Sequence, residues 1–214
     1  MALFDFCETL VSLQTADDFV KFVITKKNLY FRLVKFYSYN SRVYNRLARF
    51  VPALHSLKKF YILNLLRGLD SNVLEELAVE YADLLREKFL ISQVYDELIS
   101  LKASGYTICV VSAGYSIYIS KFLPNIVDVI ISNDFEIHNT RFTGRLNKPD
   151  CICNEKVARL EEFFLGKDIE YSIGYSDSIT DLPMLELCST GVVVSHKKAQ
   201  SWAKELNFHE IVYI

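Results

Sequence analysis

Short apolar runs that end in polar residues alternate with amphipathic segments along this chain of 214 residues. Each run is rich in β-branched or aromatic residues and is bounded by turn-forming residues, a pattern typical of buried strands. The predicted strands cover residues 1–4, 107–112, 127–132, 169–177 and 191–195, with an edge strand at 211–214. Residues 135–137 and 141–146, separated by His138, Asn139 and Thr140, predict a hairpin.

Apolar residues at intervals of three and four predict helices in the segments between these strands. They cover residues 17–26, 30–37, 41–50, 54–66, 71–88, 93–103, 115–122, 157–164, 184–187 and 200–206. Gly68, Gly105 and Gly166 are placed to end three of them. Strands that alternate with helices predict an α/β protein with a three-layer core around a parallel sheet.

Charge is distributed unevenly along the chain. Residues 19–69 contain eleven lysines and arginines and no aspartate or glutamate, although the whole chain carries a net charge of only -2. The rest of the chain therefore carries -13. Such a break in electrostatic character indicates that the helices after the first strand form a second domain.

Composition favours a folded intracellular protein. Hydrophobic residues make up 51% of the chain, with only 7 glycines and 4 prolines. No basic leader precedes the first strand, and no apolar run reaches the roughly 18 residues of a membrane span. The five cysteines are scattered and odd in number, which favours reduced thiols and a cytoplasmic location. Cys151 and Cys153 lack a second pair at zinc-ligand spacing.

Chemically capable side chains follow several of the predicted strands. Asp5 ends the first strand, Ser112 ends the second, and Asp177 and Asp181 follow the strand at 169–177. Lys156 lies at the start of an amphipathic helix between them. Because ligands of open α/β sheets bind at the carboxyl ends of the strands, we expect these groups to converge on one crevice.

The order of these residues resembles the haloacid dehalogenase superfamily, and within it the phosphoserine phosphatase-like branch. The family's first motif, D-x-D-x-T, matches residues 5–9, and its strand ending in Ser or Thr matches Ser112. Its lysine matches Lys156, with Lys148 as the competing candidate, and its G-D-x-x-x-D motif matches residues 176–181. The resemblance implies a Rossmann-like core at 1–13 and 92–214 with an inserted all-helical C1-type cap at 14–91.

The resemblance also implies a phosphatase mechanism and a role for each matched residue. Asp5 is the expected nucleophile, which forms an aspartyl-phosphate. Mg²⁺ is the expected cofactor, since a hard dication offsets repulsion between carboxylate and phosphate. Its ligands come from Asp5, the carbonyl of Cys7, Asp177 and Asp181. Ser112, with the amides of Ala113 and Gly114, is expected to hold phosphoryl oxygens, and Lys156 to neutralise them.

Cys7 departs from the family pattern, which has a second aspartate at this position. The family uses that aspartate as general acid for the leaving group and then as general base for water. A thiol with an ordinary pKa of about 8.5 donates a proton less readily, so we expect slowed turnover. Glu8 is the adjacent substitute, but it points away from the site if the strand continues through Cys7.

Several interpretations are open for the basic, aromatic-rich segment around residues 30–37. In one, it closes over a small phosphorylated substrate, and its cations favour a bulky or polyanionic one. In another, the partner is an anionic membrane, which the segment contacts peripherally. Nucleic acid is not expected, since no recognition motif is present. A solvated surface without a partner is the simplest alternative. A catalytically degenerate protein that binds a phosphorylated ligand is the alternative to an enzyme.

Overall fold

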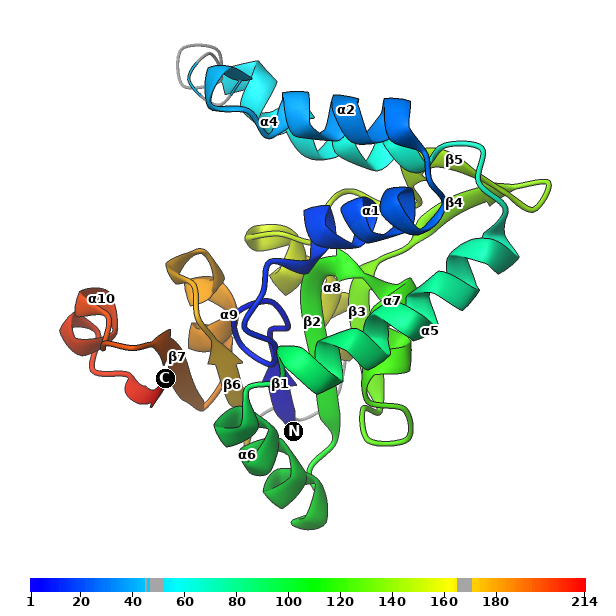
Figure 1. Ribbon diagram of the computed structural model, residues 1–214. Helices are drawn as coiled ribbons and strands as arrows, with labels where there is room; N and C mark the ends of the chain where they lie inside the picture. Colours follow the sequence, from blue (N-terminus) through cyan, green and yellow to red (C-terminus); the bar gives the residue numbers. More distant parts are fainter. Residues whose placement is uncertain (45, 47–51, 165–170) are drawn as a thin grey trace.

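The computed structural model of the chain describes residues 1–44, 46, 52–164 and 171–214. Within these residues the central sheet has the strand order β3-β2-β1-β6-β7-β8 (Figure 1). All neighbouring strands in it are parallel, which confirms the predicted parallel α/β core. The bounds are β1 (Ala2–Phe4), β2 (Ile108–Tyr115), β3 (Val129–Asn133), β6 (Ile173–Ser176), β7 (Thr190–His196) and β8 (His209–Tyr213).

Strand β1 lies in the middle of the sheet and pairs on both sides. Phe4 is opposite Val110 of β2 and Tyr175 of β6, and the N–H of Asp5 donates to the carbonyl of Tyr175 at 2.9 Å. The carboxyl ends of β1, β2 and β6 are therefore adjacent. The residues that follow them meet at one edge of the sheet.

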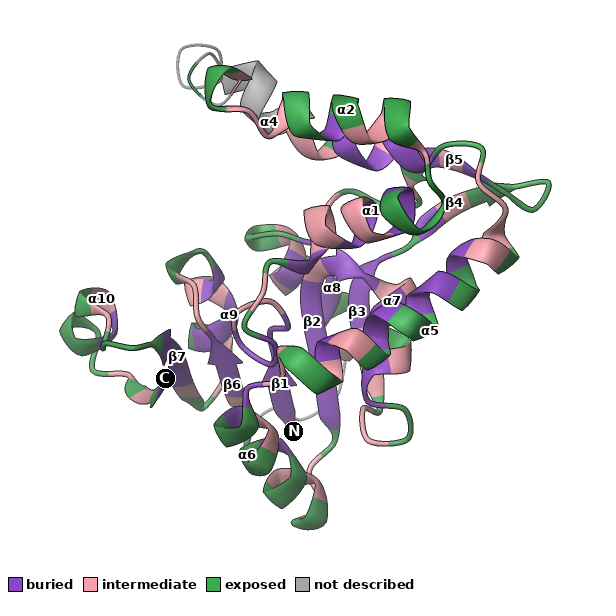
Figure 2. Ribbon diagram, viewed as in Figure 1, coloured by how far each residue is buried: buried purple, intermediate pink, exposed green. Residues whose placement is uncertain are grey.

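Helices cover both faces of the sheet, because side chains alternate along each strand. Leu3 packs into one buried cluster, and its neighbour Phe4 packs into the other. The Phe4 face is covered by α5 (Ser71–Lys88), α6 (Ser92–Ala103) and α7 (Ser116–Phe122). The Leu3 face is covered by α8 (Asn154–Phe164), α9 (Leu182–Leu187) and α10 (Ser201–Glu205), and Figure 2 shows the buried sheet between the two layers.

A further group of helices, which we call the cap, stands beyond the carboxyl edge of the sheet (Figure 1). They are α1 (Thr15–Lys26), α2 (Tyr30–Tyr39), α4 (Pro52–Leu63) and the 3₁₀ turn η1 (Asn64–Leu66). The buried cluster on the Phe4 face continues into them through Phe19 and Phe36. Helix α5 belongs to the predicted cap range but packs along α7 of the core. The boundaries at 14 and 91 stay a prediction, and half of the expected helix at 41–50 falls outside the described residues.

The predicted hairpin is confirmed, with β4 (Phe135–His138) antiparallel to β5 (Arg141–Leu146). It forms a separate sheet that supports the cap, which the sequence pattern did not indicate. Gly68 N–H donates to the carbonyl of Phe142 at 2.8 Å, and Phe142 N–H donates to Leu69 at 3.0 Å. Gly144 has a φ of 89°, and a Cβ there would lie 2.4 Å from the side chain of Asn64. The hairpin therefore approaches the cap closely enough to require glycine.

One predicted strand is much shorter in the structure, and the first strand does not meet the condition that was attached to Glu8. The strand expected at 169–177 covers Ile173–Ser176, and residues 165–170 lie outside the described part of the chain. The first strand ends at Phe4 and does not continue through Cys7. No helix in the described residues is both long and apolar enough to cross a membrane.

Candidate active site

Lys156 lies between two carboxylates at the carboxyl edge of the sheet. Its Nζ is 2.6 Å from Asp5 Oδ1 and 2.6 Å from Asp181 Oδ2, and all three side chains are at most 8% exposed. Ser176 Oγ donates to the same Asp181 oxygen at 2.7 Å. The competing candidate, Lys148, is 60% exposed and pairs with Glu162 at 3.7 Å. The geometry therefore favours Lys156 as the lysine of the site.

The loop before α8 holds Lys156 in this position. The backbone N–H of Cys151 donates to Asn133 Oδ1 at 2.9 Å, which fastens the loop to the end of β3. Arg159, one turn into α8, donates to the carbonyl of Ser132 at 2.7 Å. Cys153 turns the chain into the helix with a φ of 47°. These bonds fix the first turn of α8, and with it the lysine.

Thr9 joins the first and last motifs. Its Oγ1 lies 3.2 Å from Asp5 Oδ2 and 3.4 Å from Asp177 Oδ1, and it accepts from the N–H of Asp177 at 3.1 Å. The chain returns to Asp5 because the N–H groups of Leu10 and Val11 both donate to the carbonyl of Phe6. Sequence reasoning gave Thr9 no role, although its place in the first motif was a signal for one.

The second motif lies in the last part of β2, where the pairing register with β3 shifts, and it lines the same cavity as Asp5. Ser112 is buried, and its Oγ accepts from the N–H of Gly114 at 3.0 Å. A Cβ at Gly114 would lie 2.7 Å from the Tyr118 hydroxyl, so the close approach requires glycine. The Gly114 amide, expected to bind phosphate, is thus already engaged. The carbonyl of Ala113 accepts from Asn133 Nδ2 at 2.8 Å and from Lys59 Nζ of the cap at 2.9 Å.

A cavity of about 210 Å³ opens where these groups meet. The predicted site residues Asp5, Cys7, Ser112, Ala113, Lys156, Asp177 and Asp181 all line it, whereas Gly114 does not. Its other lining residues are Glu8, Gln14, Ile152, Cys153, Ser178 and Thr180. Among the described residues, Lys156 is the one basic side chain in this lining.

The thiol of Cys7 faces a short chain of hydroxyl groups. Its Sγ is 3.1 Å from Thr15 Oγ1, which is 2.7 Å from the Tyr118 hydroxyl. Burial raises the pKa of Cys7 to about 11, and the Asp5 carboxylate adds to the effect. The thiol therefore stays protonated at neutral pH.

Glu8 does not point away from the site, contrary to the expectation from sequence. Because β1 ends at Phe4, the chain is free to turn, and Glu8 adopts a φ of 56° and lines the cavity. Its carboxylate accepts from Gln14 Nε2. Glu8 thus adds another carboxylate to the cavity wall.

Negative charge exceeds positive charge in the cavity. Burial raises the pKa of Asp177 to about 7, and the carboxylates of Asp5, Glu8 and Asp181 add to the effect. Burial alone would lower the pKa of Lys156, but Asp5 and Asp181 raise it above its usual value. The lysine is therefore charged, but its single positive charge is too small to balance all the surrounding carboxylates.

The oxygen atoms around this excess charge suit Mg²⁺. No group of three or more His, Cys, Asp or Glu side chains in the described parts of the chain surrounds a common ion position. Mg²⁺ commonly binds through only one or two carboxylates, with water and substrate phosphate as its other ligands. Asp5 and Asp177 are two such carboxylates. Both lie near the Thr9 hydroxyl, and the nearby lysine does not balance their negative charge.

Known proteins resemble this chain in sequence and fold. A family model described as haloacid dehalogenase-like hydrolase matches residues 2–186. A phosphoserine phosphatase from Archaeoglobus fulgidus is 28% identical over 130 residues, which are 59% of this chain and 38% of that protein. The chain thus matches less than half the length of this relative.

Two solved structures share the fold. A Bordetella pertussis protein of unknown function has a TM-score of 0.82 at 21% identity, over 99% of this chain and 97% of the other. A phosphoserine phosphatase with a phospho-aspartyl intermediate analogue has a TM-score of 0.60 at 19% identity, over 99% and 91%. The family match includes strands β1, β2, β3 and β6 and all the residues that line the cavity. The chain therefore belongs to the haloacid dehalogenase-like hydrolases.

Proposed function

We propose that the protein is a Mg²⁺-dependent phosphomonoesterase in which Asp5 forms an aspartyl-phosphate. The observation that carries the proposal is the buried triad of Asp5, Lys156 and Asp181, with both lysine contacts at 2.6 Å, beside the carboxylate of Asp177. Phosphoryl transfer needs a nucleophile, a cation in a fixed position and carboxylates that can bind a metal ion, and one cavity holds all three.

The chain's own residues divide the work of the reaction. Lys156 fixes one oxygen of Asp5, so the carboxylate has a defined orientation for attack on phosphorus. A carboxylate oxygen then bonds to phosphorus, the ester bond breaks, and the leaving alcohol takes up a proton. Water next attacks the phosphorus, which releases inorganic phosphate and restores Asp5. Ser112 and the amide of Ala113 stand where they can hold phosphoryl oxygens.

Mg²⁺ held by Asp5, Asp177 and the Cys7 carbonyl would supply positive charge to offset the repulsion between carboxylate and phosphate. Asp181 was also expected as a ligand. Its Oδ2 accepts from Lys156 and from Ser176, which supports a role in positioning the lysine.

The proposed site lacks a good proton donor for the leaving group. Cys7, with a pKa of about 11, holds its proton too firmly to serve as a good general acid, and its neutral thiol is a poor base for water. We therefore expect slow turnover, fastest for substrates whose alcohol leaves readily without a proton.

A small phosphorylated substrate suits the cavity better than a polyanionic one. The volume of about 210 Å³ and the lining's single basic residue among those described favour one phosphoryl group on a compact alcohol. The similarity to a phosphoserine phosphatase agrees with that size class. The surplus of cations on the cap lies outside this lining.

A phosphatase assay with p-nitrophenyl phosphate and Mg²⁺ tests the proposal, because nitrophenolate leaves without a proton. Asp5→Asn removes the nucleophile but keeps the side-chain volume, and we expect turnover to disappear. Trapping the acyl phosphate with borohydride in the native chain, but not in the variant, would identify Asp5 as its site. Turnover that survives in Asp5→Asn would contradict the mechanism.

The raised pKa of Cys7 favours one alternative, a degenerate member that binds phosphate without turning it over. Thermal unfolding with inorganic phosphate and Mg²⁺ separates the two. Stabilisation of the native chain, with no turnover of any phosphorylated substrate in a broad panel, supports the binding protein. Turnover that depends on Asp5 excludes it.

A further inference from the structure

Helix α2 exposes four large apolar side chains on one side. Phe31 is 90% exposed, Tyr30 and Val34 are each 69% exposed, and Tyr37 is 54% exposed. Residues 30, 34 and 37 recur at helical spacing, so they form a stripe, and Phe31 lies beside it. The other side of the helix is packed, since Phe36 is buried and Leu33 contacts the main cluster. The exposure is therefore confined to one face.

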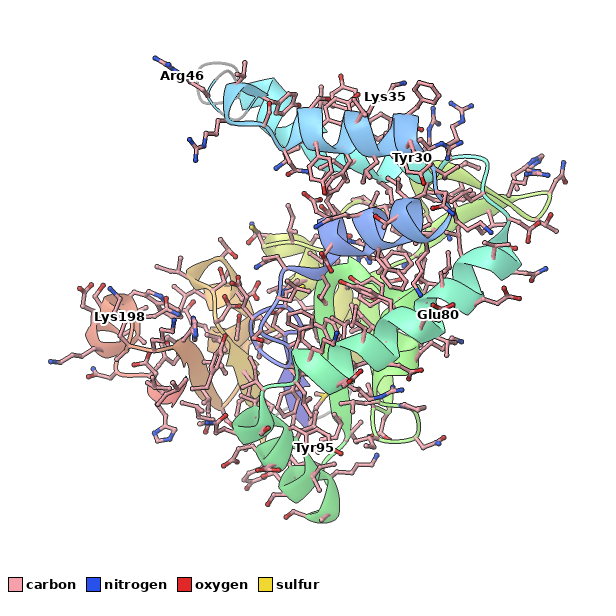
Figure 3. All side chains as sticks on the ribbon, in the orientation of Figure 1. Tyr30, Lys35, Arg46, Glu80, Tyr95 and Lys198 are labelled. Carbon is pink, nitrogen blue, oxygen red and sulfur yellow. The ribbon has the colours of Figure 1, made fainter. Side chains whose placement is uncertain are left out.

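Basic residues lie on α2 and in the chain just before and just after it. Lys27, Lys35 and Arg42 are exposed, and Figure 3 shows Tyr30 and Lys35 on α2, in a different part of the molecule from Lys198. Among the described residues, no ion pair involves any of these three cations. Residues 19–69 contain no acidic residue that could neutralise them.

We propose that this surface, the α2 face, binds the surface of a bilayer that contains anionic phospholipid. The α2 face comprises Tyr30, Phe31, Val34 and Tyr37 with the flanking Lys27, Lys35 and Arg42. A helix with an aromatic and aliphatic centre and a cationic border fits the boundary between headgroups and acyl chains, where apolar side chains enter the bilayer and cations meet lipid phosphates and carboxylates.

The charge pattern argues against a second copy of this chain as the occupant. A two-fold dimer brings the same patch of both copies together. On the α2 face this would bring the cations of the two copies, Lys27, Lys35 and Arg42, towards each other, with no carboxylate from residues 19–69 to separate them. An anionic partner relieves that repulsion. The inference does not depend on the proposed phosphatase activity, because adsorption needs no turnover.

Co-sedimentation of the full chain with vesicles tests the proposal. We expect binding to vesicles of phosphatidylcholine mixed with phosphatidylserine, weakening as salt increases, and little binding to phosphatidylcholine alone. Phe31→Ser should lower the partition coefficient roughly tenfold through loss of apolar burial. Lys35→Glu should lower it at least about fivefold through the altered charge.

Two matched variants control for apolar content and for charge. Val79→Ser removes a 46% exposed valine from α5, and Lys198→Glu reverses an exposed lysine far along the chain. Both should bind vesicles like the native chain. Circular dichroism of all four variants checks that they are folded, and Val34→Ser replaces Phe31→Ser if that protein fails to fold.

Three outcomes would overturn the proposal. One is the absence of sedimentation with anionic vesicles at low salt. A second is equal loss of binding in Lys198→Glu and Lys35→Glu, which would mean attraction by overall charge alone. The third is a dimer in solution that Phe31→Ser converts to monomer, which would assign the α2 face to self-association.

Discussion

Charged residues are concentrated both in the cavity at the edge of the sheet and on the outer face of the cap. They are mostly buried and paired in the cavity, whereas on the cap they are exposed and of one sign. Lys156 is 4% exposed and held between two carboxylates at 2.6 Å. Lys35 on α2 is exposed, in a segment that contains no acid at all. In the cavity each charge has a position set by the fold. On the cap, the sequence sets an excess of positive charge over the surface, but not a fixed position for each charge.

This difference has an energetic origin. A buried ion is stable only with partners at close range, and removing one partner leaves the other uncompensated. An exposed ion is solvated and screened, so its neighbours can vary at little cost. Substitutions in the cavity should therefore have large and specific effects, and substitutions on the cap small and additive ones.

Lys156→Met should have the largest effect. It leaves Asp5 and Asp181 buried without their cation, and we expect turnover to fall about 10²- to 10³-fold and the free energy of unfolding to fall by about 3 kcal/mol. Protonation relieves the repulsion between the carboxylates, so the variant should become relatively more stable as pH falls. Urea unfolding at several pH values measures this.

Lys148→Met is the matched control, because its partner Glu162 is 73% exposed and 3.7 Å away. We expect a change in stability of at most about 0.5 kcal/mol. Equal losses in the two lysine variants would contradict the contrast between buried and exposed charge.

Cys7→Asp should raise turnover of an alkyl phosphate about 10²-fold, because a carboxyl group transfers protons near neutral pH far better than a thiol of pKa about 11. Steady-state kinetics measure this, and Cys7→Ser, which adds no acid, should give no gain. Rates that are equal in the native chain and in Cys7→Asp would show that the thiol is no handicap.

Mg²⁺ affinity should depend on pH through Asp177. Its carboxyl group must lose a proton to bind the ion, and its pKa is raised to about 7. Apparent affinity should therefore rise about tenfold per pH unit below 7 and level off above it. Calorimetric titration in two buffers of different ionisation enthalpy would detect the released proton, and Asp177→Asn should release none. A flat profile between pH 5 and pH 8 would remove Asp177 from the proposed ligands.

Lys59, on α4 of the cap, contacts the core next to the cavity. Its Nζ lies 2.9 Å from the carbonyl of Ala113 and 2.5 Å from Asp150 Oδ1. Lys59→Met should raise KM by about fivefold, the loss of roughly one hydrogen bond in holding the Ala113 turn, with kcat nearly unchanged. Lys58→Met, whose partner Asp17 is 3.9 Å away, should leave KM unaltered. An equal rise in both would assign the effect to cap charge in general.

The predictions from sequence agree best with the structure for residues that directly follow a predicted strand. Asp5 and Ser112 directly follow apolar runs, and parallel pairing brings the ends of those runs together, so their meeting was predictable. The support of the cap by the hairpin was not, because it depends on backbone bonds between Phe142 and residues 68–69. Glu8 was expected to point away only if the first strand continued through Cys7, and β1 pairs with β2 and β6 only over Ala2–Phe4.

The inner position of β1 also bears on how the protein is made. The strand before Asp5 pairs with β2 and β6, which follow it more than a hundred positions later in the chain. Contacts so distant in sequence are slow to form and leave apolar segments exposed during synthesis. Asp5 is therefore synthesised well before β2 and β6, and it reaches its native surroundings only after both strands have followed it.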